Sequence, residues 1–483
     1  MSRGLRLGLD ASLQGKYRDA LGYARQSTVL RRKQIDSAAD AISDITAADP
    51  HIAAKAELVH SLLIEGDLAL KLGDIAGAEA ADTEALNYLA QVRGLPLWWQ
   101  PQALILLGQI EAAQNRLTFA ERNLRRGVAL EEKLFGKTAP TAQAYLVLTR
   151  FYSGIEDYPA AITAFRTAME ILGGDETARA LVTNDDVGAF LAAAGAVAAK
   201  DPANRAKLEA EMFRATQLMG SGVADQAIAH ASARLAAGDP AIAALVRDEQ
   251  EAEHDRDAAR LRLAAEQAKP LEERGSILEN QLAKDIDAAT AKVAALLQKL
   301  QQSFPAYASF ASPQPAELAA LQKQLAPDEA FVSFTIGRES AYLLVVRADR
   351  LRAYRLQTTE AALTQAVNDL RKAFVPRLGA VPAFDLRLAN TLYRQLLGPA
   401  DADLAGVRHL AAAPSGALAS LPLALLVTAP AAPNGYSSAE WLLRRMAISE
   451  VPSPRAFIEL RTHVFYASLC DEDTIKGILV KLR

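Results

Sequence analysis

Residues 144–172 read AYLVLTRFYSGIEDYPAAITAFRTAMEIL. Tyr145, Leu148 and Tyr152 lie three and then four positions apart, which places them on one stripe of a helix. The sequence breaks near Gly154–Asp157, and a second helical stripe of small and aromatic residues follows. Its members are Ala161, Phe165 and Ala168. Two amphipathic helices joined by so short a turn predict a helical hairpin, and the alanines allow the two helices to approach closely.

The same pattern recurs upstream, so the segment is one copy of a repeat. Two copies lie at Leu104, Leu107, Gly108, Leu117, Ala120 and Leu124, and at Leu62, Gly66, Ile75, Ala78 and Ala85. A looser copy lies at Leu7, Gly8, Tyr17 and Ala20. The alanines Ala78, Ala120 and Ala161 are separated by 42 and 41 residues. The first helix of the looser copy would begin at or before Met1, so we expect the natural N-terminus to lie further upstream.

These units resemble tetratricopeptide repeats, although they are about 41 rather than about 34 residues long. The resemblance rests on Leu107-Gly108, Tyr152, Tyr158, Ala161, Phe165 and Ala168, which occupy the family's Leu-Gly, Tyr, Tyr, Ala, Phe and Ala positions. Such hairpins stack into a solenoid with a concave surface. The resemblance therefore implies that residues 1–237 bind other proteins or peptides in the repeat groove.

A loop at Gly94–Pro101 interrupts the repeats and contains Trp98 and Trp99. The pair has two interpretations. It forms a hydrophobic lid on the solenoid, or it supplies exposed anchors for a bound peptide, as tryptophans do at many interfaces.

The middle of the chain predicts a long helical hairpin over residues 238–303. The sequence is strongly charged from Pro240, and after Pro270 apolar residues follow a heptad spacing. These are Leu282, Ile286, Ala289, Val293, Leu296 and Leu300. We predict antiparallel helices near 240–268 and 271–302, followed by a proline-spotted linker, 304–327, with one short helix.

Residues 328–461 change to a pattern of alternating strands and helices. Strands are expected at Phe331–Ile336, Ala341–Val346, Leu351–Leu356, His409–Ala413 and Met446–Val451, and helices at about 358–375, 385–397 and Trp441–Arg445. This order predicts an α/β sandwich. The whole chain is therefore expected to be mainly α, with a helical solenoid and a long helical hairpin, followed by a partial α/β domain and an atypical tail, 462–483.

Three stretches of the last third carry a second resemblance. They are Pro327-Asp328-Glu329-Ala330, then Pro414-Ser415-Gly416-Ala417-Leu418 with Leu421–Leu426, and Trp441-Leu442 with Ile448–Pro454. They resemble the CHAT family, a caspase-like peptidase domain found attached to tetratricopeptide repeats. Ser415 stands where that family usually has Asp. Counting the repeats, the two resemblances cover roughly residues 1–461, and they imply that residues 328–461 form the N-terminal part of a caspase-like domain.

The CHAT resemblance places the catalytic His and Cys beyond the Pro-Ser turn, on two adjacent strands. A caspase-type dyad needs both groups within hydrogen-bonding distance. His463 and Cys470 are only seven residues apart. They would lie about 23 Å apart on opposite faces of one strand, or about 10 Å apart on one helix. We therefore predict no catalytic residues and a domain truncated before its dyad.

Composition excludes several other classes of site. The net charge of −4 gives no basic stripe for nucleic acid. One cysteine, Cys470, and six histidines without paired spacing predict neither a disulfide framework nor a metal site, and no cofactor motif is present. The sequence contains no run of 18 apolar residues, so no membrane span is predicted. No secretory signal pattern is seen, so we expect a cytoplasmic protein.

Two functions follow from these patterns. The first is a protein–protein interaction scaffold with an incomplete, inactive caspase-like domain. The alternative is a cysteine peptidase whose catalytic half is missing from this chain. Only the strands before Pro452 are expected, so we also predict self-association through an incomplete sheet edge.

Overall fold

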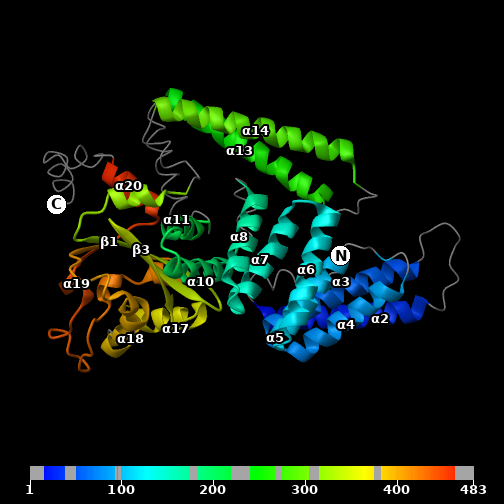
Figure 1. Cartoon of the computed structure of the whole chain (residues 1–483), viewed down its shortest axis with the longest axis horizontal. Coiled ribbons are helices and arrows are strands. Elements are labelled where there is room, and N and C mark those ends of the chain that lie inside the picture. The colour runs from blue at the N-terminus through cyan, green and yellow to red at the C-terminus, as the bar shows by residue number, and fades with distance from the viewer. Residues whose placement is uncertain are drawn as a thin grey trace. The chain divides into compact units, whose positions relative to one another are not determined.

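Figure 1 shows a computed structural model of the chain, which describes residues 16–38, 50–92, 95, 99–173, 182–218, 240–267, 274–303, 315–374 and 382–462. The chain divides into two compact units. The first unit comprises Met1–Gly173 with Gln267–Arg274, and the second comprises Gly174–Glu266 with Gly275–Arg483.

The first unit is built from successive helical hairpins. Its described helices are α2 (Tyr17–Ala38), α3 (Pro50–Lys71), α4 (Ile75–Gln91), α5 (Trp99–Ala113), α6 (Leu117–Phe135), α7 (Ala139–Gly154) and α8 (Tyr158–Leu172). Helix α3 packs on α4, α5 on α6 and α7 on α8, and each pair also contacts the next (Figure 1). The helix pairs predicted from the sequence are confirmed, and the described residues between 16 and 303 contain no strand.

The turns inside these hairpins share one backbone geometry. Gly73, Asn115 and Glu156 each have φ between 61° and 80°, and they lie 42 and 41 residues apart. In every copy the next amide donates to a carbonyl five residues earlier, as in Asp74 to Ala69 at 2.9 Å. This bond closes a helix that ends in a left-handed residue. The repeat is therefore present in the backbone as well as in the side-chain pattern.

Small residues set the distance between paired helices. Ala78, Ala120 and Ala161 are completely buried. A Cβ atom placed on Gly108 would lie 2.6 Å from Cγ of Leu124 and 3.0 Å from the carbonyl oxygen of Ala120. Helices α5 and α6 are thus closer than any larger residue at this position would allow.

The long helical pair of the second unit is α13 (Pro240–Gln267) and α14 (Ser276–Ser303). Ala252 of α13 is buried with Val293 and Leu296 of α14. At the other end of the pair, the amide of Gly275 donates to Oε1 of Glu266 over 2.8 Å. These contacts give the predicted antiparallel hairpin, with the heptad residues Val293 and Leu296 at its seam.

The described strands of the second unit form one mixed sheet. They are β1 (Glu329–Ile336), β2 (Ala341–Arg347), β3 (Arg350–Leu356), β4 (His409–Ala413) and β5 (Ala447–Glu450), in the order β3-β2-β1-β4-β5. Strands β3, β2 and β1 pair antiparallel, whereas β1, β4 and β5 pair parallel. Every strand predicted from the sequence is present.

Helices cover both faces of this sheet. The remaining described helices of the second unit are α10 (Asn184–Lys200), α11 (Arg205–Ala215), α16 (Leu318–Lys323), α17 (Glu360–Arg371), α18 (Leu386–Leu396), α19 (Leu442–Arg445) and α20 (Pro454–Thr462). The unit also contains the 3-10 turns η2 (Lys372–Phe374), η3 (Gly398–Ala400), η4 (Gly416–Ser420) and η5 (Leu423–Leu425). Val332 and Phe334 share a core with α17 and α18. On the opposite face Phe331 lies 5.6 Å from Phe457 of α20 between ring centroids. The α/β sandwich is confirmed, and its double cover explains why every residue of β1 is buried.

Candidate functional site

The carboxyl ends of the parallel strands are the usual place for ligands in an open α/β sheet. Here they are occupied by internal hydrogen bonds. Oγ of Ser415, just after β4, donates to the carbonyl of Phe334 over 2.9 Å. The Glu450 carboxylate at the end of β5 accepts from the amide of Leu423 over 2.9 Å. These bonds hold the segment after β4 against the sheet. His463 and Cys470, for which the sequence predicted no dyad, lie outside the described residues.

Trp99 is the first residue of α5. Trp98 lies outside the described residues, and Trp99 is half-buried. The Trp99 ring stacks on His60 of α3, with centroids 4.4 Å apart and the planes 22° from parallel. Burial lowers the pKa of His60. Trp99 also packs against the core of the first unit, which favours a lid, and its role as a peptide anchor stays a prediction.

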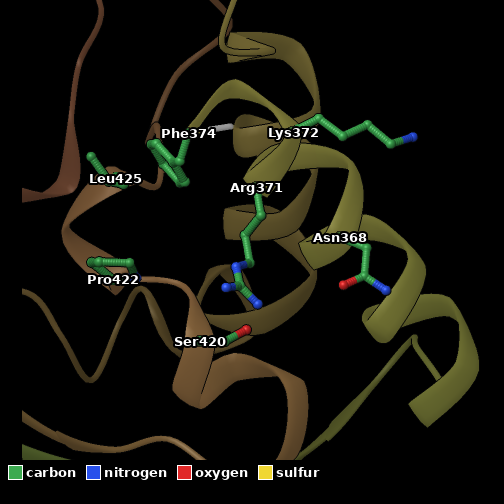
Figure 2. Close-up of a pocket in the computed structure, with 7 residues that line it drawn as sticks. All are labelled: Asn368, Arg371, Lys372, Phe374, Ser420, Pro422 and Leu425. Atoms are coloured by element: carbon green, nitrogen blue, oxygen red, sulfur yellow. The ribbon is translucent and has the colours of Figure 1, made fainter. Parts of the chain in front are cut away.

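A pocket of about 560 Å³ lies between the end of α17 and the turns η4 and η5 (Figure 2). Seven residues line it: Asn368, Arg371, Lys372, Phe374, Ser420, Pro422 and Leu425. Phe374, with 51% of its surface exposed, forms an apolar wall with Pro422 and Leu425.

The polar side of this pocket is cationic. Lys372 extends away from the other lining residues and pairs with Asp369 at 2.5 Å. Among the described residues, the Arg371 guanidinium has no hydrogen-bond or ion-pair partner, and it points toward Ser420 in Figure 2. The pocket therefore fits a ligand that carries an anionic group next to an apolar group, with the anion at Arg371 and the apolar group against the wall.

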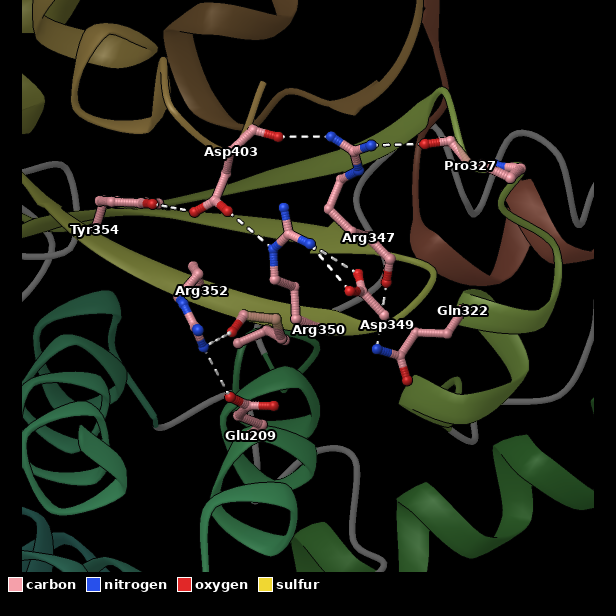
Figure 3. Close-up of polar contacts among 10 residues, drawn as sticks. Glu209, Gln322, Pro327, Arg347, Asp349, Arg350, Arg352, Tyr354 and Asp403 are labelled. Carbon is pink, nitrogen blue, oxygen red and sulfur yellow. Dashed lines mark hydrogen bonds and ion pairs between the residues drawn. The ribbon is translucent and has the colours of Figure 1, made fainter. Parts of the chain in front are cut away.

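A second polar cluster surrounds Asp403, beside the edge strand β3 (Figure 3). Asp403 accepts from Nε of Arg350 over 2.9 Å and from the Tyr354 hydroxyl. Arg347 donates to the carbonyls of Asp403 and Pro327, both over 2.6 Å. Although burial raises it, the pKa of Asp403 is lowered overall by Tyr354 and Arg350. Each of these charged groups pairs with an opposite charge or a carbonyl. The cluster therefore ties β3 to its neighbours and leaves none of these charged groups unpaired for a ligand.

A third cluster spans the three parallel strands and has the geometry of a proton relay. Nδ1 of His409, at the start of β4, lies 2.7 Å from Oε1 of Glu329, the first residue of β1. Nε2 of His409 lies 2.6 Å from Oγ of Ser449 on β5. The register explains this contact: His409 pairs with Ala447, and Ser449 is two residues further along the same face.

The ionisation of Glu329 fixes the hydrogen positions in this cluster. Burial alone raises the pKa of Glu329, but hydrogen bonds from the Ala326 amide, Arg461 and His409 lower it to about 2. A carboxylate can only accept, so Nδ1 of His409 carries a proton. In the neutral imidazole, Nε2 is therefore a lone-pair acceptor for the Ser449 hydroxyl. Arg461 of α20 donates to Glu329 over 2.6 Å and holds the carboxylate in place.

Comparison with known families bears on this part of the chain. Residues 386–465 match the family model of the CHAT domain. The chain contains a CHAT domain. The match runs from the start of α18 through α20 and includes β4 and β5. It supports the resemblance predicted from the sequence, and it relates this region to caspase-like peptidases. No curated protein matches the chain.

The His409 cluster was not predicted from the sequence; His409 and Ser449 lie within the residues that match the CHAT model, and Glu329 lies before them. His409 is the one polar residue of β4, whereas β1 contains Ser333 and Thr335 besides Glu329, and β5 contains Glu450 besides Ser449. Joining Glu329, His409 and Ser449 requires the strand order and register. Helix α20 was also not predicted, although Ser453-Pro454 is a typical helix start and Oγ of Ser453 accepts from the Ala456 amide over 3.2 Å.

The described residues also bear on metal binding and membrane insertion. No three His, Cys, Asp or Glu side chains there converge as metal ligands. No helix in the same ranges is both long and apolar enough to span a bilayer.

Proposed function

We propose that this chain is a protein-interaction scaffold, in which tetratricopeptide-like hairpins bind other proteins or peptides and the CHAT region lacks cysteine peptidase activity. The observation that carries the proposal is the recurrence of one hairpin, with the same left-handed turn residue every 41 or 42 residues. Helical hairpins that pack only on their neighbours form an extended surface suited to a peptide or a helix. The pocket beside Arg371 offers a separate place for an acidic peptide segment.

The chemistry of the CHAT region supports the second half of the proposal. A caspase-type reaction needs a thiolate with a histidine in hydrogen-bonding distance. The single cysteine of the sequence, Cys470, is separated from His463 by seven residues, which suits neither one strand nor one helix. The hydroxyl of Ser415 is engaged by the backbone of β1.

Peptide selection on the immobilised full chain tests the binding role. Random peptides displayed on phage are selected, and the dissociation constants of the best binders are measured by fluorescence anisotropy. We expect Trp98→Ala and Trp99→Ala, each measured alone, to weaken binding at least about tenfold, as loss of a buried aromatic anchor does.

Phe119→Ala is the matched control, because Phe119 is an exposed aromatic residue on α6, the second helix of its hairpin. It should leave the affinity unchanged. Circular dichroism would establish that each variant keeps its helices. Selected peptides that bind equally well to both tryptophan variants would remove these anchors from the proposal, and failure to select any binder would overturn the scaffold itself.

The alternative function is a caspase-like cysteine peptidase, favoured by the CHAT match, which extends to residue 465 and so includes His463. The two functions differ in one assay. The wild-type chain and Cys470→Ala are incubated with arginine-type peptide substrates of caspase-like enzymes. We expect no cysteine-dependent cleavage by either protein, and a wild-type activity abolished by Cys470→Ala would establish the peptidase.

A further inference from the structure

We propose that Ser449, His409 and Glu329 form a serine acyl-transfer site for small carboxylic esters, separate from any cysteine chemistry of the CHAT family. The site meets the geometric requirements of a nucleophile, a base and a residue that orients the base. The hydroxyl of Ser449 lies 2.6 Å from Nε2 of His409, and Nδ1 lies 2.7 Å from the Glu329 carboxylate. Each group comes from a different strand, so the sheet holds all three rigidly.

The charge arrangement suits a proton transfer through His409. The Glu329 carboxylate is fixed by Arg461 and by the amide of Ala326, which donates to Oε2 over 3.0 Å. It orients the imidazole and stabilises the imidazolium that forms when His409 accepts a proton. Glu329 touches no substrate in this scheme and acts as a positioning residue.

The backbone of β5 supplies a donor for the developing oxyanion. The amides of Ala447 and Val451 donate to Arg408 and Ala412 on the β4 side, each over 2.8 Å. Amides alternate in direction along a strand, so the amide of Glu450 points away from β4. Glu450 directly follows Ser449, as the amide donor follows the serine in the strand-to-helix turn of α/β-hydrolases. Ser449 lies within a strand instead of such a turn, and the outward amide of Glu450 is the donor assigned to the oxyanion.

The reaction proceeds in two balanced halves. Oγ of Ser449 attacks the ester carbonyl carbon while its proton passes to Nε2 of His409. The C–O bond to the leaving group then breaks, the alkoxide takes the proton from Nε2, and an acyl-Ser449 ester remains. Water attacks that ester with His409 again as base, which releases the carboxylic acid and regenerates the Ser449 hydroxyl.

Exposure limits the substrate to small acyl groups. Ser449 is half-buried, and the His409 side chain is 27% exposed. The pocket near Arg371 involves none of these residues. A compact ester reaches such a partly exposed site from solvent.

A biotinylated fluorophosphonate probe tests the proposal on the full chain. Attack by Ser449 forms an O–P bond and releases fluoride, and mass spectrometry of the proteolytic peptides locates the adduct. We expect modification at Ser449. His409→Gln should slow it at least about tenfold because the base is lost. Ser438→Ala, which removes an exposed serine hydroxyl bonded to the carbonyl of Gly435, should label like the wild type.

Hydrolysis of p-nitrophenyl acetate gives a second readout. The wild type should release an initial burst of nitrophenol and Ser449→Ala should not, whereas Glu329→Gln should lower kcat with KM unchanged. A folded wild type that leaves Ser449 unlabelled, or a His409→Gln variant that labels at the wild-type rate, would overturn the site. Neither result alters peptide binding by the first unit, so failure here is distinct from failure of the scaffold proposal.

Discussion

Asp82 is a carboxyl group enclosed within the first unit. It lies on α4 with 0% of its surface exposed, and neither of its side-chain oxygens has a hydrogen-bond partner among the described residues. Burial, and then the nearby Glu111 carboxyl, raise the pKa of Asp82 from 3.8 to about 8. An unpaired charge at this depth is costly, so the folded protein keeps the group protonated at neutral pH.

This raised pKa predicts that stability falls with increasing pH. Between about pH 4 and pH 8 the unfolded chain has lost the Asp82 proton while the folded chain retains it. The free energy of unfolding should therefore fall across this window, by up to about 1.4 kcal/mol per pH unit. Asp82→Asn stays neutral and should remove this contribution. We expect the variant to be more stable than the wild type at pH 8 and similar to it near pH 4, measured by urea unfolding.

Glu79 on the same helix is the matched control for Asp82. Its side chain is 38% exposed, and hydrogen bonds from Gln114 and Arg116 lower its pKa. Glu79→Gln should therefore be neutral or destabilising at pH 8, opposite in sign to Asp82→Asn. Glu131, whose pKa burial raises to about 7, adds its own slope to every variant and cancels in the comparison. Equal pH dependence of wild type and Asp82→Asn would contradict the raised pKa.

The close packing of α5 against α6 depends on one glycine, Gly108. A side chain at Gly108 would meet both Leu124 and the backbone of Ala120 at or below 3.0 Å. Because the backbone contact cannot yield by a rotamer change, Gly108→Ala should separate the helices and cost about 1–3 kcal/mol of unfolding free energy. Gly22→Ala is the control, since an added Cβ there meets nothing within 4 Å. It should be neutral or stabilising by up to about 1 kcal/mol, and a stable Gly108→Ala protein would contradict close packing of this hairpin.

Elements governed by local pattern were predictable, and those governed by distant contacts were not. The run of aromatic and β-branched residues in Phe331–Ile336 and the helical stripe from Tyr145 to Tyr152 gave a strand and a helix because each pattern is local to its own element. Asp185 of α10 instead accepts from the amides of Arg338, Glu339 and Ser340, more than 150 residues away. No local sequence pattern predicts such a contact. The His409 cluster was missed for the same reason, since its members meet only through the parallel register.

The two edge strands of the described sheet, β3 and β5, differ in the charges that oppose pairing with another chain. Strand β3 carries Arg350, Arg352 and Tyr354, which bind Asp403 and Glu209 around the edge (Figure 3). Charged side chains on an edge strand oppose addition of a further strand. Strand β5 reads AISE, and only Glu450 among its residues is charged. Of the two, β5 is the edge better suited to self-association.

We therefore expect the full chain to associate through β5 in a concentration-dependent manner, because a strand edge with few charges pairs readily with its equivalent. Static light scattering should show a molar mass that rises with concentration. Ala447 is exposed, so Ala447→Lys adds a charge to β5 without disturbing the core and should suppress the rise. Ala361→Lys adds the same charge on the exposed side of α17 and should leave the association unchanged. A wild-type mass that stays monomeric at every concentration would exclude self-association, and suppression by both lysine variants alike would assign it to overall charge instead of to β5.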